Sequence, residues 1–205
     1  MKFYRFCRFI FSPLIRLILP AKIYNKENFP KDKAIVLANH YSAMEIPVVA
    51  VRLFKKEIHA LSKKELYKNK LVGWFLKKFG GIPVDRDGMD AKAIKEAFSV
   101  LSKDKQLYIC PEGTRNKSLS KEMLPLKAGA AVFAIKTKSP IVPIMFYNKT
   151  RFFRRTHVII GKSFTLEQFY ADRAPDAKDR ATEYIAEKFR ELRIELDSIV
   201  EGKNK

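Results

Sequence analysis

His40 and Glu45 have the residue types and the spacing of a general base and its carboxylate partner, in the stretch "NHYSAMEIP". A glutamate that reaches back across the turn can bond one imidazole nitrogen and fix the tautomer, which leaves the other nitrogen as the base. The sequence has no Gly-x-Ser-x-Gly elbow to supply a serine nucleophile. The predicted nucleophile is therefore a substrate hydroxyl, which attacks an activated acyl group without an acyl-enzyme.

The same stretch also has a purely structural interpretation. Ser42 followed three residues later by Glu45 is a capping box, in which serine and glutamate satisfy free amides at the start of a helix. A histidine beside such a helix start commonly serves the fold. These residues alone leave both interpretations open.

A phosphate-binding turn is predicted in "PEGTRN". Gly113 lets the backbone approach a ligand closely, Thr114 adds a hydroxyl, and Arg115 adds a bidentate guanidinium. Arg86, in "PVDRDG", would supply a second guanidinium, and Glu112 is expected to orient an arginine or to accept a substrate hydroxyl. Either arginine alone would be interpreted as part of a surface ion pair, but two at neighbouring strand ends favour phosphate binding.

The elements that must position these residues alternate between strand and helix. Apolar runs predict strands at 34–39, 58–62, 82–84, 106–110, 141–147 and 157–161. Helical spacing is present at 43–54, in the Lys-rich segment that ends at residue 81, at 91–101, at 128–138, and near the C-terminus, where Ile185, Phe189, Leu192 and Leu196 share one face. The predicted fold class is α/β, a single domain with a mostly parallel sheet flanked by helices. In such sheets the binding site lies beyond the carboxyl ends of the strands, where the three motifs fall.

Residues 1–25 are predicted to form an amphipathic arm, followed by one domain at 26–205. On a helical wheel the cations and the serine of the arm occupy a wedge of roughly 120°; they are Lys2, Arg5, Arg8, Ser12 and Arg16. The charge-free runs are shorter than the ~20 residues that span a bilayer. We expect a helix that lies in a membrane interface, with its apolar face in the acyl boundary and its cations among headgroups. The alternative is a helix that covers the domain's own core.

The composition indicates an anionic partner. The chain has 41 basic and 22 acidic residues, a formal net charge of +19. Nucleic acid, an anionic membrane surface and a phosphorylated substrate on an acidic carrier would each satisfy that charge. Cys7 and Cys110 lie in different contexts, which favours a reducing cytoplasm over a disulfide. No metal-ligand spacing or nucleotide-binding glycine pattern is present, so we expect no metal and no cofactor.

A second basic segment, "KTRFFRRT", places Phe152 and Phe153 among four cations. It fits a stacking platform for nucleic acid, a membrane contact or a solvated hairpin edge. Strand alternation would send the two rings to opposite faces, which weakens the first two interpretations.

With these residues assembled, the chain resembles the 1-acyl-sn-glycerol-3-phosphate acyltransferase family. Four family blocks are present in order, "NHYSAME", "GGIPVDR", "PEGTRNKS" and "IVPIMF", over about residues 39–146. The resemblance implies transfer of a fatty acyl chain from coenzyme A or an acyl carrier protein to a lysophospholipid hydroxyl, giving phosphatidic acid. It also implies a peripheral or monotopic enzyme on the cytoplasmic face of the cell membrane, bound to an anionic lipid surface.

The resemblance assigns a role to each candidate residue. His40 and Glu45 would be catalytic; the glycerol phosphate would be bound by Arg86, Glu112, Gly113, Thr114 and Arg115; Pro143 would shape the acyl site. One residue departs from the pattern, since the family usually has aspartate where this chain has Glu45.

Two alternatives remain from the sequence. The acceptor could be another lysolipid or glycerol phosphate itself. From a different class, a basic membrane- or nucleic-acid-binding module without activity would explain the charge. It would not explain the ordered motifs at strand ends, so no nucleic-acid partner is expected.

Overall fold

The apolar strand segments come together in one sheet in the computed structural model, which describes residues 2–55, 57–85, 90–118 and 122–202. Within these residues the sheet has seven strands in the order β1-β7-β6-β2-β5-β3-β4. Neighbouring strands are parallel except for β6 and β7, which are antiparallel. The strands are β1 Ala21–Tyr24, β2 Ala34–Ala38, β3 His59–Lys63, β4 Gly81–Val84, β5 Gln106–Ile109, β6 Ile141–Phe146 and β7 Thr156–Ile160. The predicted mostly parallel α/β sheet is confirmed.

Strand β2 lies at the centre of the sheet. Its five residues are all buried, as expected for a parallel strand with both faces covered. It pairs with β5 on one side and β6 on the other, with Leu37 opposite both Ile109 and Pro143. The carboxyl ends of β2 and β5 therefore lie side by side, and the turns that follow them, with His40 and Glu112, start at the same edge of the sheet.

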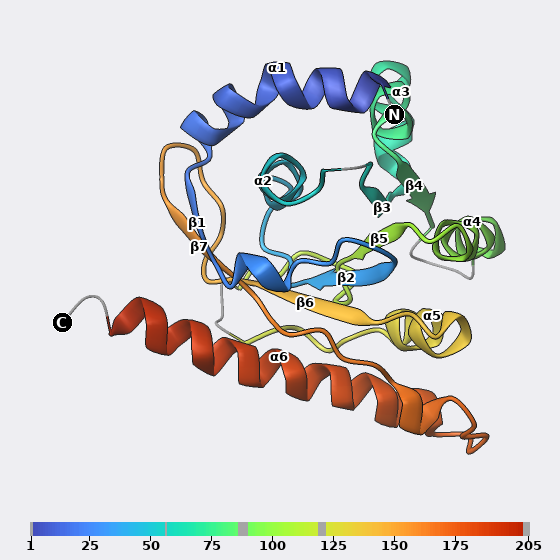
Figure 1. Cartoon of the computed structure of the whole chain (residues 1–205). Helices are drawn as coiled ribbons and strands as arrows, with labels where there is room; N and C mark the ends of the chain where they lie inside the picture. Colours follow the sequence, from blue (N-terminus) through green and yellow to red (C-terminus); the bar gives the residue numbers. More distant parts are fainter. Residues whose placement is uncertain (1, 56, 86–89, 119–121, 203–205) are drawn as a thin grey trace.

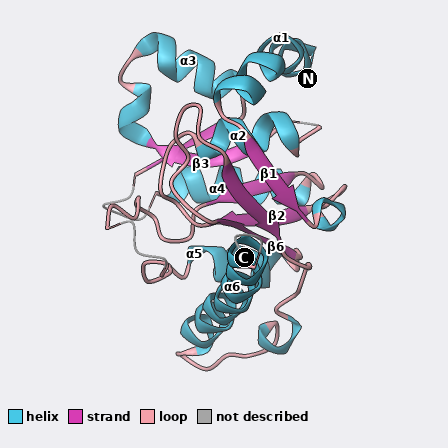
Figure 2. Cartoon of the chain, turned by 90° about the vertical axis from the view of Figure 1, so that its left-hand side faces the viewer, coloured by secondary structure: helices cyan, strands magenta, loops and turns pink. Residues whose placement is uncertain are grey.

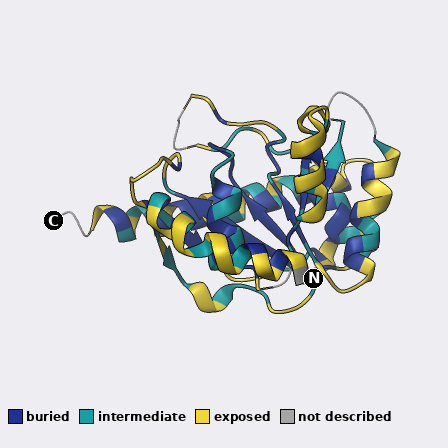
Figure 3. Ribbon diagram, turned by 90° about the horizontal axis from the view of Figure 1, so that it is seen from above, coloured by how far each residue is buried: buried dark blue, intermediate teal, exposed yellow. Residues whose placement is uncertain are grey.

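Helices cover both faces of the sheet (Figures 1 and 2). One core cluster joins the sheet to α4 Ala91–Ser102, α5 Gly129–Thr137 and α6 Ala177–Glu201. The other joins the opposite face to α1 Lys2–Ile18 and α2 Glu45–Arg52. The predicted apolar face of the last helix is buried in the first cluster, through Ile185, Phe189, Leu192 and Leu196. Seen from above, exposed residues follow the outer helices and buried ones the strands beneath (Figure 3).

Helix α3, Lys70–Lys78, follows the short 3-10 helix η2, Lys64–Tyr67, at the end of β3. Asn69 caps it by accepting the backbone N–H groups of Leu71 and Val72, each at 3.1 Å. Helix α3 packs against the first turn of α1, where the rings of Phe3 and Trp74 are 5.7 Å apart. The remaining 3-10 turns are η1, Lys26–Asn28, and η3, Glu167–Phe169.

Two cations of the polar wedge of α1 contact the protein. Arg8 and Arg16 each donate through Nη2 to the carbonyl of Val51, in the last turn of α2, at 3.3 and 3.4 Å. Arg52 donates in return to the carbonyl of Leu19, at 3.1 Å. Unpaired carbonyls at helix C-termini attract cations, so each helix supplies arginine to the other's end. Of the other predicted cations, Arg5 is exposed and the side chain of Lys2 lies outside the described part.

The outward face of α1 exposes many apolar side chains. Its exposed large side chains are Phe3, Phe6, Phe9, Ile10, Phe11, Leu14 and Leu17. The helix also covers the core, because Tyr4, Ile15 and Ile18 pack into the second cluster, so the exposed apolar face is additional to that contact. No helix in the described ranges is long and apolar enough to cross a membrane.

The predicted arm also contains a strand. Residues 21–24 form β1, which pairs with β7 in parallel from Ala21 opposite Thr156 to Tyr24 opposite Ile159. The sequence did not reveal it because "AKIY" is short, sits at the sheet edge and is only half-buried. The predicted boundary at residue 25 therefore falls after the first strand of the domain.

Candidate active site

His40 and Glu45 form a buried pair at the end of β2. The Nδ1 atom of His40 is 3.0 Å from Oε2 of Glu45, and the two side chains are 9% and 0% exposed. With a carboxylate on Nδ1, the imidazole carries its proton there and Nε2 is left unprotonated. The second nitrogen makes no hydrogen bond within the described residues. The pair thus has the geometry of a general base that is oriented by a carboxylate.

The other oxygen of the same carboxylate organises the helix start. Oε1 of Glu45 accepts the backbone N–H groups of Tyr41 and Ser42, at 3.0 and 2.6 Å. The hydroxyl of Ser42 accepts the N–H of Met44 at 3.1 Å, so the serine half of the predicted capping box is shifted by one residue. Helix α2 accordingly begins at Glu45 and not at residue 43. The two interpretations of Glu45 are compatible, because each is carried by a different oxygen.

The "PEGTRN" turn holds the backbone of His40 from both sides. Oε1 of Glu112 accepts the N–H of His40 at 2.7 Å, and the carbonyl of His40 accepts the N–H of Asn116 at 2.7 Å. Oε2 of Glu112 accepts the N–H of Leu124 at 2.9 Å. The parallel pairing of β2 with β5 makes this contact possible, since it brings the two turns to one edge.

The side chain of Glu112 contacts backbone amides, and its role in binding the glycerol phosphate stays a prediction. Its side chain is buried, and burial raises its pKa above the usual glutamate value. Both oxygens already accept backbone amides, and a carboxylate repels a phosphate. In this structure Glu112 positions His40.

The neighbouring residues of the turn are open to a ligand. Gly113 has φ of +69°, a left-handed conformation that favours glycine, and the side chain of Lys127 lies directly against it. Thr114 and Arg115 are exposed. Within the described ranges the Arg115 guanidinium has no hydrogen-bond or ion-pair partner. The turn thus offers a hydroxyl and two cations, Arg115 and Lys127, next to the His40 backbone.

The structure does not bring the other two predicted binding residues to this turn within the part of the chain that it describes. Arg86 lies outside the described residues. Pro143 is buried in β6 on the other face of the sheet, where its Cγ would lie 2.8 Å from a Cβ at position 161 beside Leu192 of α6. His40 follows the residues of β2 that face α2, so Pro143 and the histidine are on opposite sides.

Two asparagines of the motifs were not assigned a role from the sequence. Asn39 is buried; its Nδ2 donates to the carbonyl of Phe146 at 3.0 Å and its Oδ1 accepts the N–H of the same residue at 2.8 Å. Asn116 is buried as well, and its side chain donates to the carbonyl of Glu122 at 2.8 Å. An asparagine directly after a buried apolar strand is the signal that marks such a contact, because a buried amide must find partners.

An apolar cavity of about 420 Å³ adjoins the turn. It lies between the ends of β3, β4 and β5 and the helices α4 and α5, and Gly113 and Lys127 form part of its wall. Its apolar lining includes Leu61, Val84, Ile94, Ile109 and Phe133. A cavity of this kind suits an aliphatic chain whose polar end remains at the turn.

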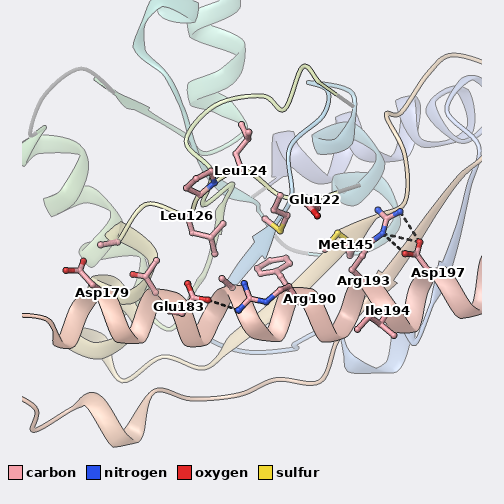
Figure 4. Close-up of a pocket in the computed structure, with 16 residues that line it drawn as sticks. Glu122, Leu124, Leu126, Met145, Asp179, Glu183, Arg190, Arg193, Ile194 and Asp197 are labelled. Atoms are coloured by element: carbon pink, nitrogen blue, oxygen red, sulfur yellow. Dashed lines mark hydrogen bonds and ion pairs between the residues drawn. The ribbon is translucent and has the colours of Figure 1, made fainter. Parts of the chain in front are cut away.

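A larger hollow of about 910 Å³ lies between α6 and the segment 122–128 (Figure 4). Its cations are already paired within it, since Arg190 bonds Glu183 at 2.6 Å and Arg193 bonds Asp197 at 2.9 Å. Size alone therefore does not make it the site for a phosphorylated substrate.

Comparison with known proteins points in one direction. A family model described as Acyltransferase matches residues 20–147. A Bacillus subtilis (strain 168) protein named 1-acyl-sn-glycerol-3-phosphate acyltransferase is 31% identical over 202 residues, which cover 96% of this chain and 100% of the relative. A Streptococcus pneumoniae protein of the same name is 30% identical over 129 residues, 62% of this chain and 47% of the relative.

A solved structure has the same fold. It is the crystal structure of the 1-acyl-sn-glycerophosphate (LPA) acyltransferase PlsC from Thermotoga maritima, with a TM-score of 0.68 over 94% of this chain and 82% of the other. The sequence identity is 22%, so this similarity concerns the fold alone.

Proposed function

The chain belongs to the acyltransferase family, and we propose that it transfers a fatty acyl chain from an acyl thioester to the free sn-2 hydroxyl of 1-acyl-glycerol-3-phosphate, giving phosphatidic acid. The observation that carries the proposal is the buried His40–Glu45 pair, whose free nitrogen Nε2 has the geometry of a base for a substrate hydroxyl.

The proposed reaction uses one base and no enzyme nucleophile. Nε2 of His40 takes the proton of the lysolipid hydroxyl as its oxygen attacks the thioester carbonyl. Glu45 stabilises the imidazolium that forms. When the tetrahedral intermediate collapses, the C–S bond breaks, the new ester C–O bond remains, and the imidazolium proton passes to the departing thiolate.

The phosphate of the acceptor is proposed to bind at the turn after β5. Arg115 and Lys127 would supply charge-assisted contacts, Thr114 a hydroxyl, and Gly113 a close approach to the backbone. The turn is tied directly to His40 through Glu112 and Asn116, so a phosphate held there is held at a fixed position relative to the base. The apolar cavity beside the turn would take an acyl chain.

The donor and the location are also proposals. A coenzyme A thioester and an acyl carrier protein both bring negative charge, which suits a chain of net charge +19. The outward apolar face of α1 supports peripheral attachment to the anionic cytoplasmic face of the cell membrane.

An assay with the purified chain tests the proposal. It combines 1-acyl-glycerol-3-phosphate with acyl-coenzyme A or acyl carrier protein thioester, and measures both free thiol and phosphatidic acid. We expect stoichiometric formation of the two, and their loss in His40→Ala at unchanged circular dichroism. Glycerol 3-phosphate and other lysolipids serve as competing acceptors. Faster acylation of one of these, or full activity of His40→Ala, would contradict the assignment.

A further inference from the structure

The exposed apolar side chains of this protein are concentrated in three places. All the large apolar residues in the described part that are more than a third exposed lie on α1, on η2 and α3, or at the turn between β6 and β7, with the exceptions of Ile94 and Ile194. Those beyond α1 are Leu66, Leu71, Val72, Trp74, Phe75, Phe152 and Phe153. An exposed apolar surface of this extent normally marks an interaction site.

We propose that α3 and the β6–β7 turn are two further contacts with an anionic lipid bilayer, placed on either side of the active site. With α1 they would form one docking surface, so that the bound protein presents the ends of β2 and β5 to the bilayer interface. The inference rests on the proposed function only for what takes place at those strand ends.

The conformation of the β6–β7 turn supports this assignment. Arg151 and Arg154 form an antiparallel bridge, and Phe152 and Phe153 are the two central residues of the turn between them. Because they lie in a turn and not in a strand, the expected alternation does not apply, and both rings are exposed, by 57% and 74%. Phe153 has φ of +58°, a left-handed conformation that favours Gly or Asn. A bulky aromatic residue held in this conformation and exposed to water stabilises neither the turn nor the core.

Both outlying contacts are attached to α1. The N–H of Phe153 donates to the carbonyl of Ile18, at the last residue of α1, at 2.7 Å. At the first turn of α1, the ring of Phe3 contacts those of Trp74 and Phe79, at 5.7 and 6.0 Å. Helix α1 therefore connects the two contacts along one side of the molecule, as Figure 1 shows at its top.

The order of the strands puts the catalytic edge between the two contacts. The β6–β7 turn leaves the carboxyl end of β6, and η2 and α3 leave the carboxyl end of β3. In the sheet, β2 and β5 lie between β6 and β3, and all four strands are parallel. His40 follows β2 and Glu112 follows β5, so the active site is flanked by an aromatic contact on each side.

The charge of both segments suits an anionic surface. Four exposed cations surround the β6–β7 turn, Lys149, Arg151, Arg154 and Arg155, and α3 carries exposed Lys70, Lys77 and Lys78. Neither residues 147–156 nor residues 66–82 contain a carboxylate. Aromatic rings in the acyl boundary with cations among the headgroups is the arrangement of an interfacial anchor.

Trp74 allows a direct test of α3, because it is the one tryptophan of the chain. Vesicles of phosphatidylcholine and phosphatidylglycerol are added to the full chain, and the emission is followed together with quenching by iodide. We expect a blue shift and at least a ~3-fold loss of quenching, since a half-exposed indole would leave water. Unchanged emission in protein that co-floats with the vesicles would overturn the role of α3.

The β6–β7 turn is tested by the pair Phe152→Ser with Phe153→Asn. Asparagine accepts the left-handed conformation, so the melting temperature should not fall. We expect vesicle affinity to decrease about 10-fold or more, because two large apolar rings are removed from the interface. The matched control is Ile194→Asn, because Ile194 is an exposed apolar residue on α6, at the opposite face of the sheet. We expect the vesicle affinity of this control to stay within about twofold of wild type. Equal affinities for the double variant and the control would refute the proposal.

A second reporter separates docking from chemistry. In Phe152→Trp with Trp74→Phe, the emission should shift on vesicle addition, and this does not depend on acyl transfer. The variant Phe152→Ser with Phe153→Asn should acylate vesicle-embedded lysolipid more slowly than wild type. It should acylate a water-dispersed short-chain lysolipid at the wild-type rate. Acyl transfer absent in every variant, with the vesicle results retained, would reject the proposed function and not the docking surface. If Phe152→Ser with Phe153→Asn lost binding to single-stranded RNA without a change in vesicle affinity, the turn would be assigned to nucleic acid instead.

Discussion

Two glutamates hold His40 by different groups. Glu45 bonds the imidazole and Glu112 bonds the backbone N–H of the same residue. The ring orientation and the position of the main chain are thus fixed independently. The departure from the usual aspartate is accommodated because Glu45 is the first residue of α2, and its longer side chain reaches back to the amides of Tyr41 and Ser42 as well as to the ring.

Glu45→Gln separates the two roles of the carboxylate. The amide oxygen of glutamine can still accept the N–H groups of Tyr41 and Ser42, so the helix start should be kept. Its NH₂ group would face Nδ1 of His40, which must then accept, and the imidazole proton would move to Nε2. We expect kcat to fall by about 10³–10⁴-fold, as when a carboxylate that orients a histidine becomes an amide. Single-turnover kinetics with a urea denaturation curve will check it; near-normal kcat would show that the carboxylate serves only the helix.

Burial raises the pKa of Glu45, and activity and stability should therefore respond to pH in opposite directions. The proposed mechanism needs the carboxylate, so kcat/KM should fall as pH decreases through this raised pKa. Stability runs the other way, because a raised folded-state pKa contributes stability that is present below the unfolded pKa and is lost as pH rises through the folded one. The difference in unfolding free energy between wild type and Glu45→Gln isolates this contribution. A difference that stays constant across the acidic range would contradict the prediction.

Arg115→Ala tests the phosphate turn with little structural cost, because Arg115 is exposed. Loss of a charge-assisted contact is worth about 1.5–3 kcal/mol, which corresponds to a rise of roughly 10–100-fold in the acceptor KM. The thioester KM should be nearly unchanged. The control substrate is a lysolipid without phosphate. An equal rise in its KM would show that Arg115 does not bind the phosphate of the acceptor.

At the scale of the elements, the turn after β5 organises the turn after β2. Glu112→Gln replaces one of two accepting oxygens with a donor, so either the N–H of His40 or that of Leu124 would face another donor. We expect a loss of about 1–3 kcal/mol in unfolding free energy. We also expect lower kcat with little change in acceptor KM, because Glu112 bonds the backbone of the proposed base, His40. Urea denaturation and steady-state kinetics will measure the two effects. A large change in the acceptor KM alone would indicate that Glu112 binds the acceptor and does not position His40.

Periodicity predicted the elements that are buried on one or both faces. The predictions of the strands around His40 and of the apolar face of α6 were correct, because burial imposes a repeating pattern on these elements. Strand β1 and the conformation of the β6–β7 turn were not predicted, since the conformation of an exposed edge strand or of a turn depends on the segments that pack beside it. The pairing of His40 with Glu45 could be anticipated from spacing within one turn. The role of Glu112 could not, because it depends on which strands are adjacent in the sheet.

At the scale of the whole molecule, α1 has a structural role on one face and, in our proposal, an interfacial role on the opposite face. Phe9→Ser with Leu17→Ser changes only the exposed face and should weaken vesicle binding at constant unfolding free energy. Arg16→Ala removes a contact with the carbonyl of Val51 and should instead cost about 1 kcal/mol of stability. Flotation with vesicles and urea denaturation of both variants will distinguish the faces. Weaker folding in the first variant or weaker flotation alone in the second would reverse the assignment.

The outward apolar face of α1 also governs how the protein behaves in the absence of lipid. The net charge of +19 keeps copies apart at low ionic strength, whereas at 1 M salt the screening length is only about 3 Å. The apolar faces of two molecules can then approach each other. Added salt should therefore promote reversible association in solution while it weakens attraction to anionic vesicles. Light scattering at increasing salt, with and without mild detergent, would show a protein whose colloidal stability is lowest under the conditions that weaken its attraction to anionic lipid.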